Sequence, residues 1–172
     1  MQLCHATTEQ QWSLAEQFND VAALTQWGGE GFRFPPRRTE FLQQLQLPDT
    51  QSYVLLDDRQ NVLAFGQVCD RFNRLHLARL LVLPAYRGQR LSEHLISALL
   101  AAGLQLWPTR EASLFVFRDN PPALHSYLRL GFTETRQPGP YRSDLFFMAL
   151  SNSASRLLAA KAPSVVTTKG KI

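Results

Sequence analysis

Residues 75–93 read LHLARLLVLPAYRGQRLSE, and this stretch decides the fold. It begins as an apolar run of strand character that ends at Val82, just before Pro84. A short loop then carries Arg87 and Gly88, and apolar residues at helical spacing begin at Leu91. The stretch therefore predicts a strand, a turn and the start of a helix.

The predicted turn has the features of a phosphate site. A strand-to-helix junction points unpaired backbone N–H groups at one spot, and the helix dipole adds partial positive charge there. Arg87 and Arg90 would reinforce that charge. Many turns of this kind carry a glycine and an arginine and bind nothing, so the turn alone is equally compatible with a plain structural role.

Residues 120–132 form the second informative stretch, NPPALHSYLRLGF. Asp119 or Asn120 can cap a helix there, and the two prolines that follow are tolerated in its first turn. Ala123 and Tyr127 are four residues apart and therefore share one face of that helix.

Together the two stretches resemble the GNAT superfamily of acyl-CoA-dependent N-acetyltransferases. The family's second motif, N-x-x-A-x-x-x-Y-x-x-x-G-F, is matched in full by Asn120, Ala123, Tyr127, Gly131 and Phe132. Its first motif, V-x-P-x-x-[RQ]-x-x-G-x-[GA], is matched at Val82, Pro84 and Arg87. The chain departs from that motif at Arg90 and Ser92, where the family has two small residues. In element order the resemblance spans residues 3–150.

The resemblance implies an α/β (α+β) fold with a mixed, mostly antiparallel central sheet of about seven strands. Helices would cover both faces, and a splayed pair of strands would bind the cofactor. The residue pattern predicts one or two helices within residues 12–24 and a longer helix that begins at Leu91 and stops at Gly103. Strands are predicted at residues 2–7, 52–57, 62–69, 75–83, 111–117 and 144–150.

Length and composition fit one globular domain. The chain has 172 residues, of which 45% are hydrophobic, and this excludes a disordered chain. No basic residue precedes Arg33 and no apolar run approaches the roughly 18 residues of a membrane span, so we expect a soluble, cytoplasmic protein that does not bind membranes. Cys4 and Cys69 lack metal-ligand spacing and are expected to be small buried hydrophobes, with no metal site.

The positive charge is concentrated at the end of the sequence. The tail, residues 151–172, holds four basic residues and no acidic one, which leaves 14 Lys and Arg against 14 Asp and Glu in residues 1–150. We therefore expect an acetyltransferase domain at residues 1–150, followed by a basic tail with a short helix to Ala162 and a flexible end. Because the body is formally neutral, nucleic acid, including a tRNA substrate, is an unlikely partner despite the sequence pI of 9.4.

The resemblance also implies acetyl-CoA (coenzyme A) as cofactor and assigns residues to it. Backbone at the strand end, Leu80, Leu81 and Val82, would polarise the thioester carbonyl and pair with the pantetheine arm. The phosphates would lie beside Arg87 on the backbone N–H groups of Gly88, Gln89, Arg90, Leu91, Ser92 and Glu93. The Arg90 side chain either adds a charge-assisted contact by pointing outward or fills the space that the small residues leave.

Asn120 would cap its helix and hydrogen-bond the cofactor arm, and Tyr127 would protonate the leaving thiolate. A phenol of pKa near 10 can protonate a thiolate of pKa near 8.5 at a cost of about 2 kcal/mol. The alternative role for a helical tyrosine is core packing.

Residues 27–36, WGGEGFRFPP, are not expected to form regular structure, because three glycines and two prolines interrupt both the helical and the strand spacing of apolar residues. Trp27 and Phe32 either pin this loop to the core or line the roof of the acceptor site, in which case Glu30 or Arg33 would face the substrate. No general base is identifiable, because Phe115 stands where ribosomal-protein acetyltransferases have a glutamate. His76 and Glu30 are weak candidates, and a structural role for His76 is the alternative.

The sequence thus favours an N-acetyltransferase that transfers an acetyl group from acetyl-CoA to a primary amine of a small molecule or protein, by direct attack in a ternary complex. The alternative is a catalytically weak GNAT-fold module that binds an acyl-CoA as a sensor or interaction partner. Members of the family commonly dimerise, so a homodimer is an expectation.

Overall fold

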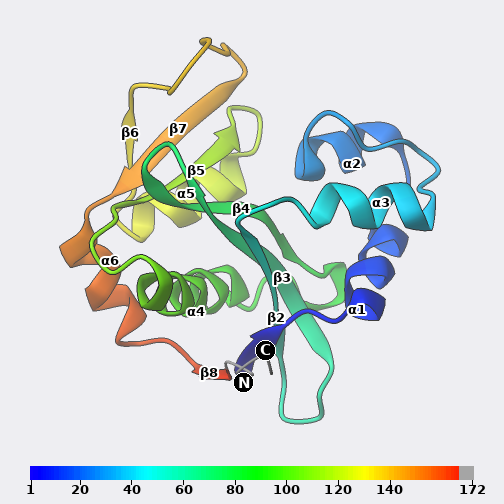
Figure 1. Cartoon of the computed structure of the whole chain (residues 1–172), viewed down its shortest axis with the longest axis horizontal. Coiled ribbons are helices and arrows are strands. Elements are labelled where there is room, and N and C mark those ends of the chain that lie inside the picture. Colours follow the sequence, from blue (N-terminus) through cyan, green and yellow to red (C-terminus); the bar gives the residue numbers. More distant parts are fainter. Residues whose placement is uncertain (167–172) are drawn as a thin grey trace.

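The computed structural model describes residues 1–166 and contains one mixed sheet of eight strands (Figure 1). The strand order is β6-β7-β5-β4-β3-β2-β1-β8. Neighbouring strands are antiparallel except for the pairs β4–β5 and β1–β8. This confirms the expected mixed, mostly antiparallel α/β architecture. The strands are β1 Gln2–His5, β2 Thr50–Leu56, β3 Val62–Arg71, β4 Arg74–Val82, β5 Ala112–Phe117, β6 Thr133–Thr135, β7 Leu145–Leu150 and β8 Ser164–Val166.

Helices cover both faces of the sheet (Figure 1). On one face lie α4, α5 and α6, and α6 packs along α4. On the other face α1 to α3 cover the half of the sheet built from β2 to β4. The helices are α1 Thr8–Ser13, α2 Val21–Gly28, α3 Arg38–Leu45, α4 Leu91–Leu106, α5 Pro121–Arg129 and α6 Asn152–Ala159, with short 3₁₀ helices at Leu14–Gln17 and Pro84–Tyr86.

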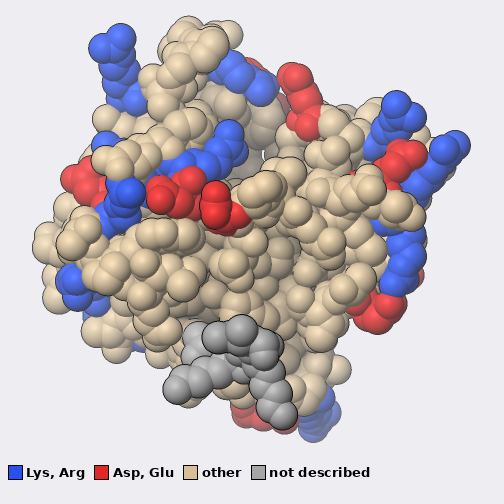
Figure 2. Space-filling model, in the orientation of Figure 1, with Lys and Arg blue, Asp and Glu red and all other residues tan. Residues whose placement is uncertain are grey.

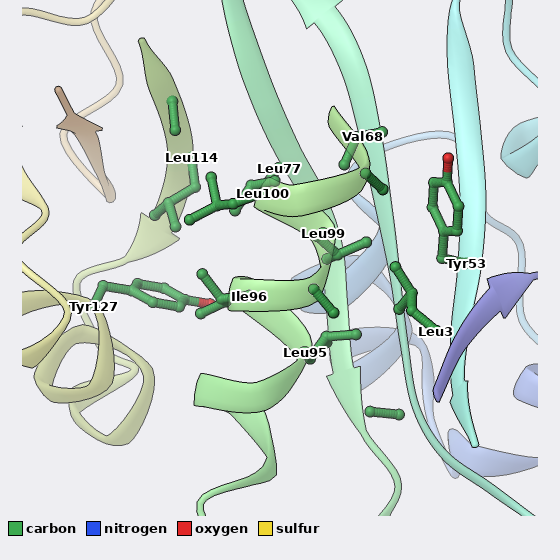
Figure 3. Close-up of a cluster of buried hydrophobic side chains, with 14 of the residues drawn as sticks. Leu3, Tyr53, Val68, Leu77, Leu95, Ile96, Leu99, Leu100, Leu114 and Tyr127 are labelled. Carbon is green, nitrogen blue, oxygen red and sulfur yellow. The ribbon is translucent and has the colours of Figure 1, made fainter. Parts of the chain in front are cut away.

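Two apolar clusters lie on the two sides of the sheet, because successive side chains of a strand point to opposite faces. In β2, Tyr53 and Leu55 face the α4 cluster, whereas Val54 and Leu56 face the cluster under α1 to α3. Figure 3 shows the α4 cluster, in which Leu95, Ile96, Leu99 and Leu100 of α4 meet Leu77, Val68 and Leu114 of the sheet and Tyr127 of α5.

Local signals account for the start of several helices. Thr7 and Gln10 form a capping box at α1, in which each side chain accepts a hydrogen bond from the other residue's backbone N–H. Asp20 and Ser151 cap α2 and α6 with their side-chain oxygens. Each such cap contributes about 1 kcal/mol to helix stability.

The long helix does not stop at Gly103, as its sequence predicted, but continues to Leu106. The glycine is needed for close packing instead, because a Cβ at this position would lie 2.4 Å from Cδ1 of Leu75 in β4. Its absent side chain lets α4 approach the sheet above the start of that strand.

The C-terminal part of the described chain is more ordered than expected. The predicted short helix is confirmed as α6, but Ser164–Val166 forms β8 beside β1 rather than a flexible end. Its residues complete the sheet edge, where Val165 packs against the α4 cluster. The expectation for residues 167–172 lies outside the described residues, and the division of the chain near Ser151 stays a prediction. No helix within residues 1–166 has the length and apolar character to span a membrane.

Candidate active site

The two central strands of the sheet separate along their length. Parallel pairing of β4 with β5 begins at Leu75–Ala112 and ends at Leu77–Leu114. Beyond these residues β4 stays with β3, and β5 stays with β7. The carboxyl-terminal halves of β4 and β5 therefore diverge, as the resemblance implied, and open a gap in the middle of the sheet.

A β-bulge in β4 lies where the strands separate. The register between β3 and β4 shifts there, so that Arg79 and Leu80 together stand opposite Gly66 of β3. Arg79 has a φ of 50°, in the left-handed region that non-glycine residues seldom adopt. A Cβ on Gly66 would lie 2.6 Å from Cδ1 of Leu99, so the glycine lets α4 pack closely at the bulge.

The turn from β4 to α4 exposes backbone donors. Gly88 and Arg90 have φ values of 79° and 57°, and a Cβ on Gly88 would meet no atom within 4 Å. Arg90 occupies the N-cap position of α4, and no side chain hydrogen-bonds the helix start. The N–H of Glu93 donates to the carbonyl oxygen of Arg90 at 3.1 Å, whereas no side chain caps the N–H groups of Leu91 and Ser92. These two are available to an anion, and the helix dipole favours negative charge there.

The Arg90 side chain points out of the turn. It is 68% exposed, and its Nε donates to Oε1 of Glu93 at 3.2 Å. The same carboxylate oxygen accepts from Nη2 of Arg129 at 2.5 Å. Two arginines thus offset the one acidic charge in the first turn of α4, and Arg90 leaves the space above the turn open.

The other predicted cofactor residues surround this turn. Arg87 donates from Nε to the carbonyl oxygen of Val82 at 3.3 Å, and the Ser92 hydroxyl lies 3.5 Å from that of Ser126 in α5. Leu91 is buried and Gln89 is exposed. Past the bulge, Leu80 and Val82 pack against the α4 cluster, whereas Leu81 joins the opposite cluster.

Tyr127 is brought to the α4 side of the gap by α5. Asn120 caps this helix, with its side-chain oxygen accepting from the N–H of Ala123 at 3.3 Å. Figure 3 shows the Tyr127 ring directed from α5 toward Ile96 of α4. Tyr127 is 8% exposed, and burial raises its pKa to about 12. At neutral pH its hydroxyl therefore carries a proton.

The segment of residues 27–36, called here the Trp27 loop, packs on the opposite face, at the bulge; its first two residues, Trp27 and Gly28, end α2 and are not irregular as predicted. The indole N–H of Trp27 donates to the carbonyl oxygen of Arg79 at 2.9 Å. The Trp27 ring also contacts Phe18, Phe32 and Phe41, with centroid distances of 4.9, 5.8 and 6.2 Å. These aromatic side chains hold the loop against the sheet beside the gap. Of the two roles that the sequence allowed for Trp27 and Phe32, they therefore fill at least the first, packing onto the core.

One acidic residue of this loop contacts the β6–β7 connection. Glu30 is 3.9 Å from Arg142 of the β6–β7 connection, and Arg33 is exposed. Gln26 of α2 donates to Asp119, which follows β5, at 3.5 Å. Figure 2 shows the surface hollowed between the part formed by α2 and the part formed by β6 and β7, with charged side chains at its edge.

His76 is enclosed by aromatic rings. It is 3% exposed, its Nδ1 is 2.9 Å from the Ser113 hydroxyl, and its ring lies within 5.3 to 6.3 Å of the Phe72, Phe115 and Phe147 centroids. Burial, with a smaller contribution from Arg71, lowers the pKa of His76 to about 3. The imidazole is therefore neutral at pH 7. Phe115, at the position of the family's glutamate, belongs to the same aromatic group.

Sequence reasoning missed Arg79 and Gln67. The Arg79 Nε donates to the carbonyl oxygen of Gly28 at 3.2 Å, and its Nη1 donates to Oε1 of Gln67 at 2.7 Å. Gln67 is fully buried. The available signal was a lone charged residue inside the apolar run of β4 and a lone amide inside that of β3, since buried strands seldom carry such groups without a purpose.

Within residues 1–166 no three His, Cys, Asp or Glu side chains come together as a metal site would require. The candidate site is therefore built from backbone donors, one phenol, aromatic rings and a guanidinium.

Comparison with known proteins agrees with this geometry. The model of the acetyltransferase (GNAT) family matches residues 18–132, so the chain belongs to this family and is an acyltransferase. No curated protein sequence matches the chain.

Solved structures with a similar fold include spermidine N-acetyltransferase from Vibrio cholerae in complex with CoA and spermine. The TM-score is 0.70 at 17% identity, over 90% of this chain and 96% of the other. A chimera of the Vibrio cholerae enzyme with hSSAT has a TM-score of 0.68 at 16% identity, over 90% of this chain and 96% of the other. A dodecameric structure of that spermidine N-acetyltransferase, in an intermediate state, has a TM-score of 0.63 at 15% identity, over 88% of this chain and 93% of the other. At these identities the similarity establishes the fold.

Proposed function

We propose that this chain is an acetyl-CoA-dependent N-acetyltransferase that acetylates a primary amine by direct attack in a ternary complex. The observation that carries the proposal is that β4 and β5 separate beyond Leu77 and Leu114, with Tyr127 in the apolar cluster on one face of the sheet and Trp27 packed against the cluster on the other. A cofactor and an amine can therefore reach one point from opposite sides of the sheet.

The turn fits a pyrophosphate. Its left-handed residues at Gly88 and Arg90, the uncapped start of α4 and the open space above Gly88 form an anion cradle of backbone N–H groups. Arg87, Ser92 and the backbone N–H groups of residues 88–92 would hold the phosphates, because the N–H of Glu93 donates to Arg90 instead. The strand edge at residues 80–82 would pair with the pantetheine arm. Asn120, which caps α5, would hydrogen-bond the same arm.

When bound, acetyl-CoA would supply a thioester, so that a C–N bond forms as the C–S bond breaks, the electron pair leaves with sulfur, and the amine loses one proton. Tyr127 would donate a proton to that sulfur. With its pKa at about 12, full transfer to a thiolate of ordinary pKa near 8.5 costs about 5 kcal/mol. Desolvation raises a thiolate's pKa in the same apolar surroundings, which lowers this cost.

No carboxylate replaces the family's glutamate at Phe115, and His76 is enclosed and neutral. We propose that the amine reaches the site neutral or loses its proton to water. An α-amine of pKa near 8 has a substantial neutral fraction at cellular pH, so no strong base is required.

The neighbouring structures named as spermidine N-acetyltransferases support a small-molecule amine as acceptor. An assembly of two or more copies and a cytoplasmic location stay predictions. Glu30 and Arg33 are proposed to face the acceptor, with Trp27 and Phe32 lining the roof of its site.

The test is CoA release from acetyl-CoA with a panel of amines, measured with a thiol reagent for wild type, Tyr127→Phe and the control Tyr141→Phe, which alters an exposed tyrosine. We expect amine-dependent turnover in the wild type and the control. Tyr127→Phe should lower kcat about 100-fold, with the KM for acetyl-CoA within threefold, because the ring that packs the core is kept. Binding of acetyl-CoA without turnover of any amine would favour the sensor alternative instead.

A further inference from the structure

Arg79 lies in the β-bulge of β4, next to the point where β4 and β5 stop pairing. It is two residues beyond Leu77, the last residue of β4 that pairs with β5. Its Nε contacts the carbonyl oxygen of Gly28 in the Trp27 loop, and its central carbon lies 5.5 Å from the ring centroid of Phe32. The positive charge is thus held on the face opposite the α4 turn, beneath the loop and beside the gap.

This charge has no acidic partner among residues 1–166. The ion pairs within that part of the chain involve other arginines and the N-terminus, and the two hydrogen bonds of Arg79 go to a neutral carbonyl and a neutral amide. Five N–H donors are available on a guanidinium, and partly buried arginines are normally paired with an acid. Burial, with a contribution from Arg71, lowers the pKa of Arg79, whereas Cys69 raises it.

Two acidic groups near the hollow contact residues other than Arg79. Glu30 is paired with Arg142, and Asp119 accepts a hydrogen bond from Gln26. Arg71, on the same face of β3 as Gln67, adds a second positive charge, with its guanidinium 5.0 Å from the Phe72 ring centroid. Beneath the loop the Arg79 guanidinium is a positive charge, which disfavours an ammonium group placed directly against it.

We propose that Arg79 determines acceptor specificity, and that the acceptor is a small molecule carrying a carboxylate together with its amine, as an amino acid does. The inference rests on the proposed acetyl transfer. A carboxylate bound to the remaining N–H donors of Arg79 supplies the missing counter-charge through charge-assisted hydrogen bonds. The amine of the same molecule then lies next to the gap, where the thioester would be.

A purely structural role for Arg79 is distinguishable from this one. If its hydrogen bonds to Gly28 and Gln67 only held the loop, removing the charge would slow every acceptor alike. If it binds a carboxylate, the loss is confined to acceptors that carry one.

The experiment compares matched acceptors that differ only by the carboxylate: lysine with cadaverine, ornithine with putrescine, and phenylalanine with phenethylamine, with spermidine as a polyamine probe. The kcat/KM of each is measured for wild type, Arg79→Lys, Arg79→Gln and the control Arg136→Gln, which removes an exposed arginine of the β6–β7 connection. Calorimetry with acetyl-CoA shows separately whether each protein has an intact cofactor site.

We expect the wild type and the control to prefer the acid of at least one pair by 10-fold to 100-fold in kcat/KM, as charge-assisted hydrogen bonds of this strength imply. Arg79→Gln should remove that preference, and Arg79→Lys should keep part of it. Calorimetry of the acid binding to the CoA-bound proteins should rank them in the same order, with the wild type binding most tightly, Arg79→Lys less tightly and Arg79→Gln least.

Equal or better use of the decarboxylated amines or spermidine by the wild type would overturn the inference and leave the acetyltransferase proposal standing. So would an equal loss for both members of a pair in Arg79→Gln, or intact acetyl-CoA binding with neither turnover nor binding of any acid. Absence of acetyl-CoA binding would overturn the proposed function itself.

Discussion

Acidification from pH 7.5 to pH 5.0 is expected to destabilise the fold through His76. In the folded protein the imidazole lies among aromatic rings, where burial holds its pKa at about 3, against an ordinary value of 6.5. The unfolded chain therefore binds a proton as the pH falls below 6.5, whereas the folded chain does not until near pH 3. Stability from this group is complete above pH 6.5 and is lost as the pH falls from there toward 3.

The size of the effect follows from the two pKa values. At pH 5.0 the unfolded imidazole is almost fully protonated and the folded one is neutral, so linkage removes about 2 kcal/mol of unfolding free energy. The limit at lower pH is about 5 kcal/mol, from 1.36 kcal/mol per pKa unit. Against a typical total of about 5 to 15 kcal/mol, even the smaller figure is readily measured.

Urea unfolding, monitored by tryptophan fluorescence at pH 7.5 and pH 5.0, measures this loss of unfolding free energy in wild type and His76→Gln. The amide keeps a group that can hydrogen-bond Ser113 but does not titrate, so its unfolding free energy should fall by about 2 kcal/mol less than that of the wild type. His125→Gln, which removes an exposed imidazole from α5, is the matched control.

Equal pH dependence in the wild type and His76→Gln would refute the reasoning. The imidazole would then titrate alike in both states, which requires access to water, and His76 would return as a candidate base for the acceptor amine.

Further predictions concern the turn, α4 and the pH profile. Gly103→Ala should cost about 1 to 3 kcal/mol of unfolding free energy, because its Cβ would overlap the buried Leu75 side chain; urea unfolding measures this, and a neutral result would mean that α4 shifts freely. Arg90→Gly should be about 1 kcal/mol more stable than Arg90→Ala in the same assay, since both lose the ion pair and only alanine keeps the left-handed strain. Ser92→Glu should weaken acetyl-CoA binding at least 10-fold in calorimetry through repulsion of phosphate, whereas Ser92→Gln, similar in size and neutral, should weaken it less; equal losses would point to size alone. In wild type, kcat/KM for the acceptor should rise with pH toward the pKa of the amine, and a plateau that begins well below it would reveal a protein base.

The parts of the site that depend on local sequence were predictable. The spacing of residues 82–92 located the strand, turn and helix, and the motif at residues 120–132 located α5 and its cap, because turn chemistry and helical period act over a few residues. The assignment of Tyr127 and of the cofactor residues stays a prediction until activity is measured.

The remaining features depend on contacts between distant segments. The left-handed conformation of Arg79 occurs together with hydrogen bonds to Trp27 and Gly28, which are about 50 residues away in the chain. The close approach of Gly103 in α4 to Leu75 in β4 joins residues far apart in the sequence. Strand β8 has three residues, too few to show an alternating pattern. Local pattern carries no information on any of these.

Calorimetric titration of wild type and Arg90→Gly with acetyl-CoA tests the central claim most directly. The outward Arg90 side chain and the open turn predict one site per chain with a micromolar Kd in both proteins, within about threefold of each other. Binding by the variant alone would show that Arg90 blocks the turn, and binding by neither would contradict an acetyl-CoA site between β4 and β5.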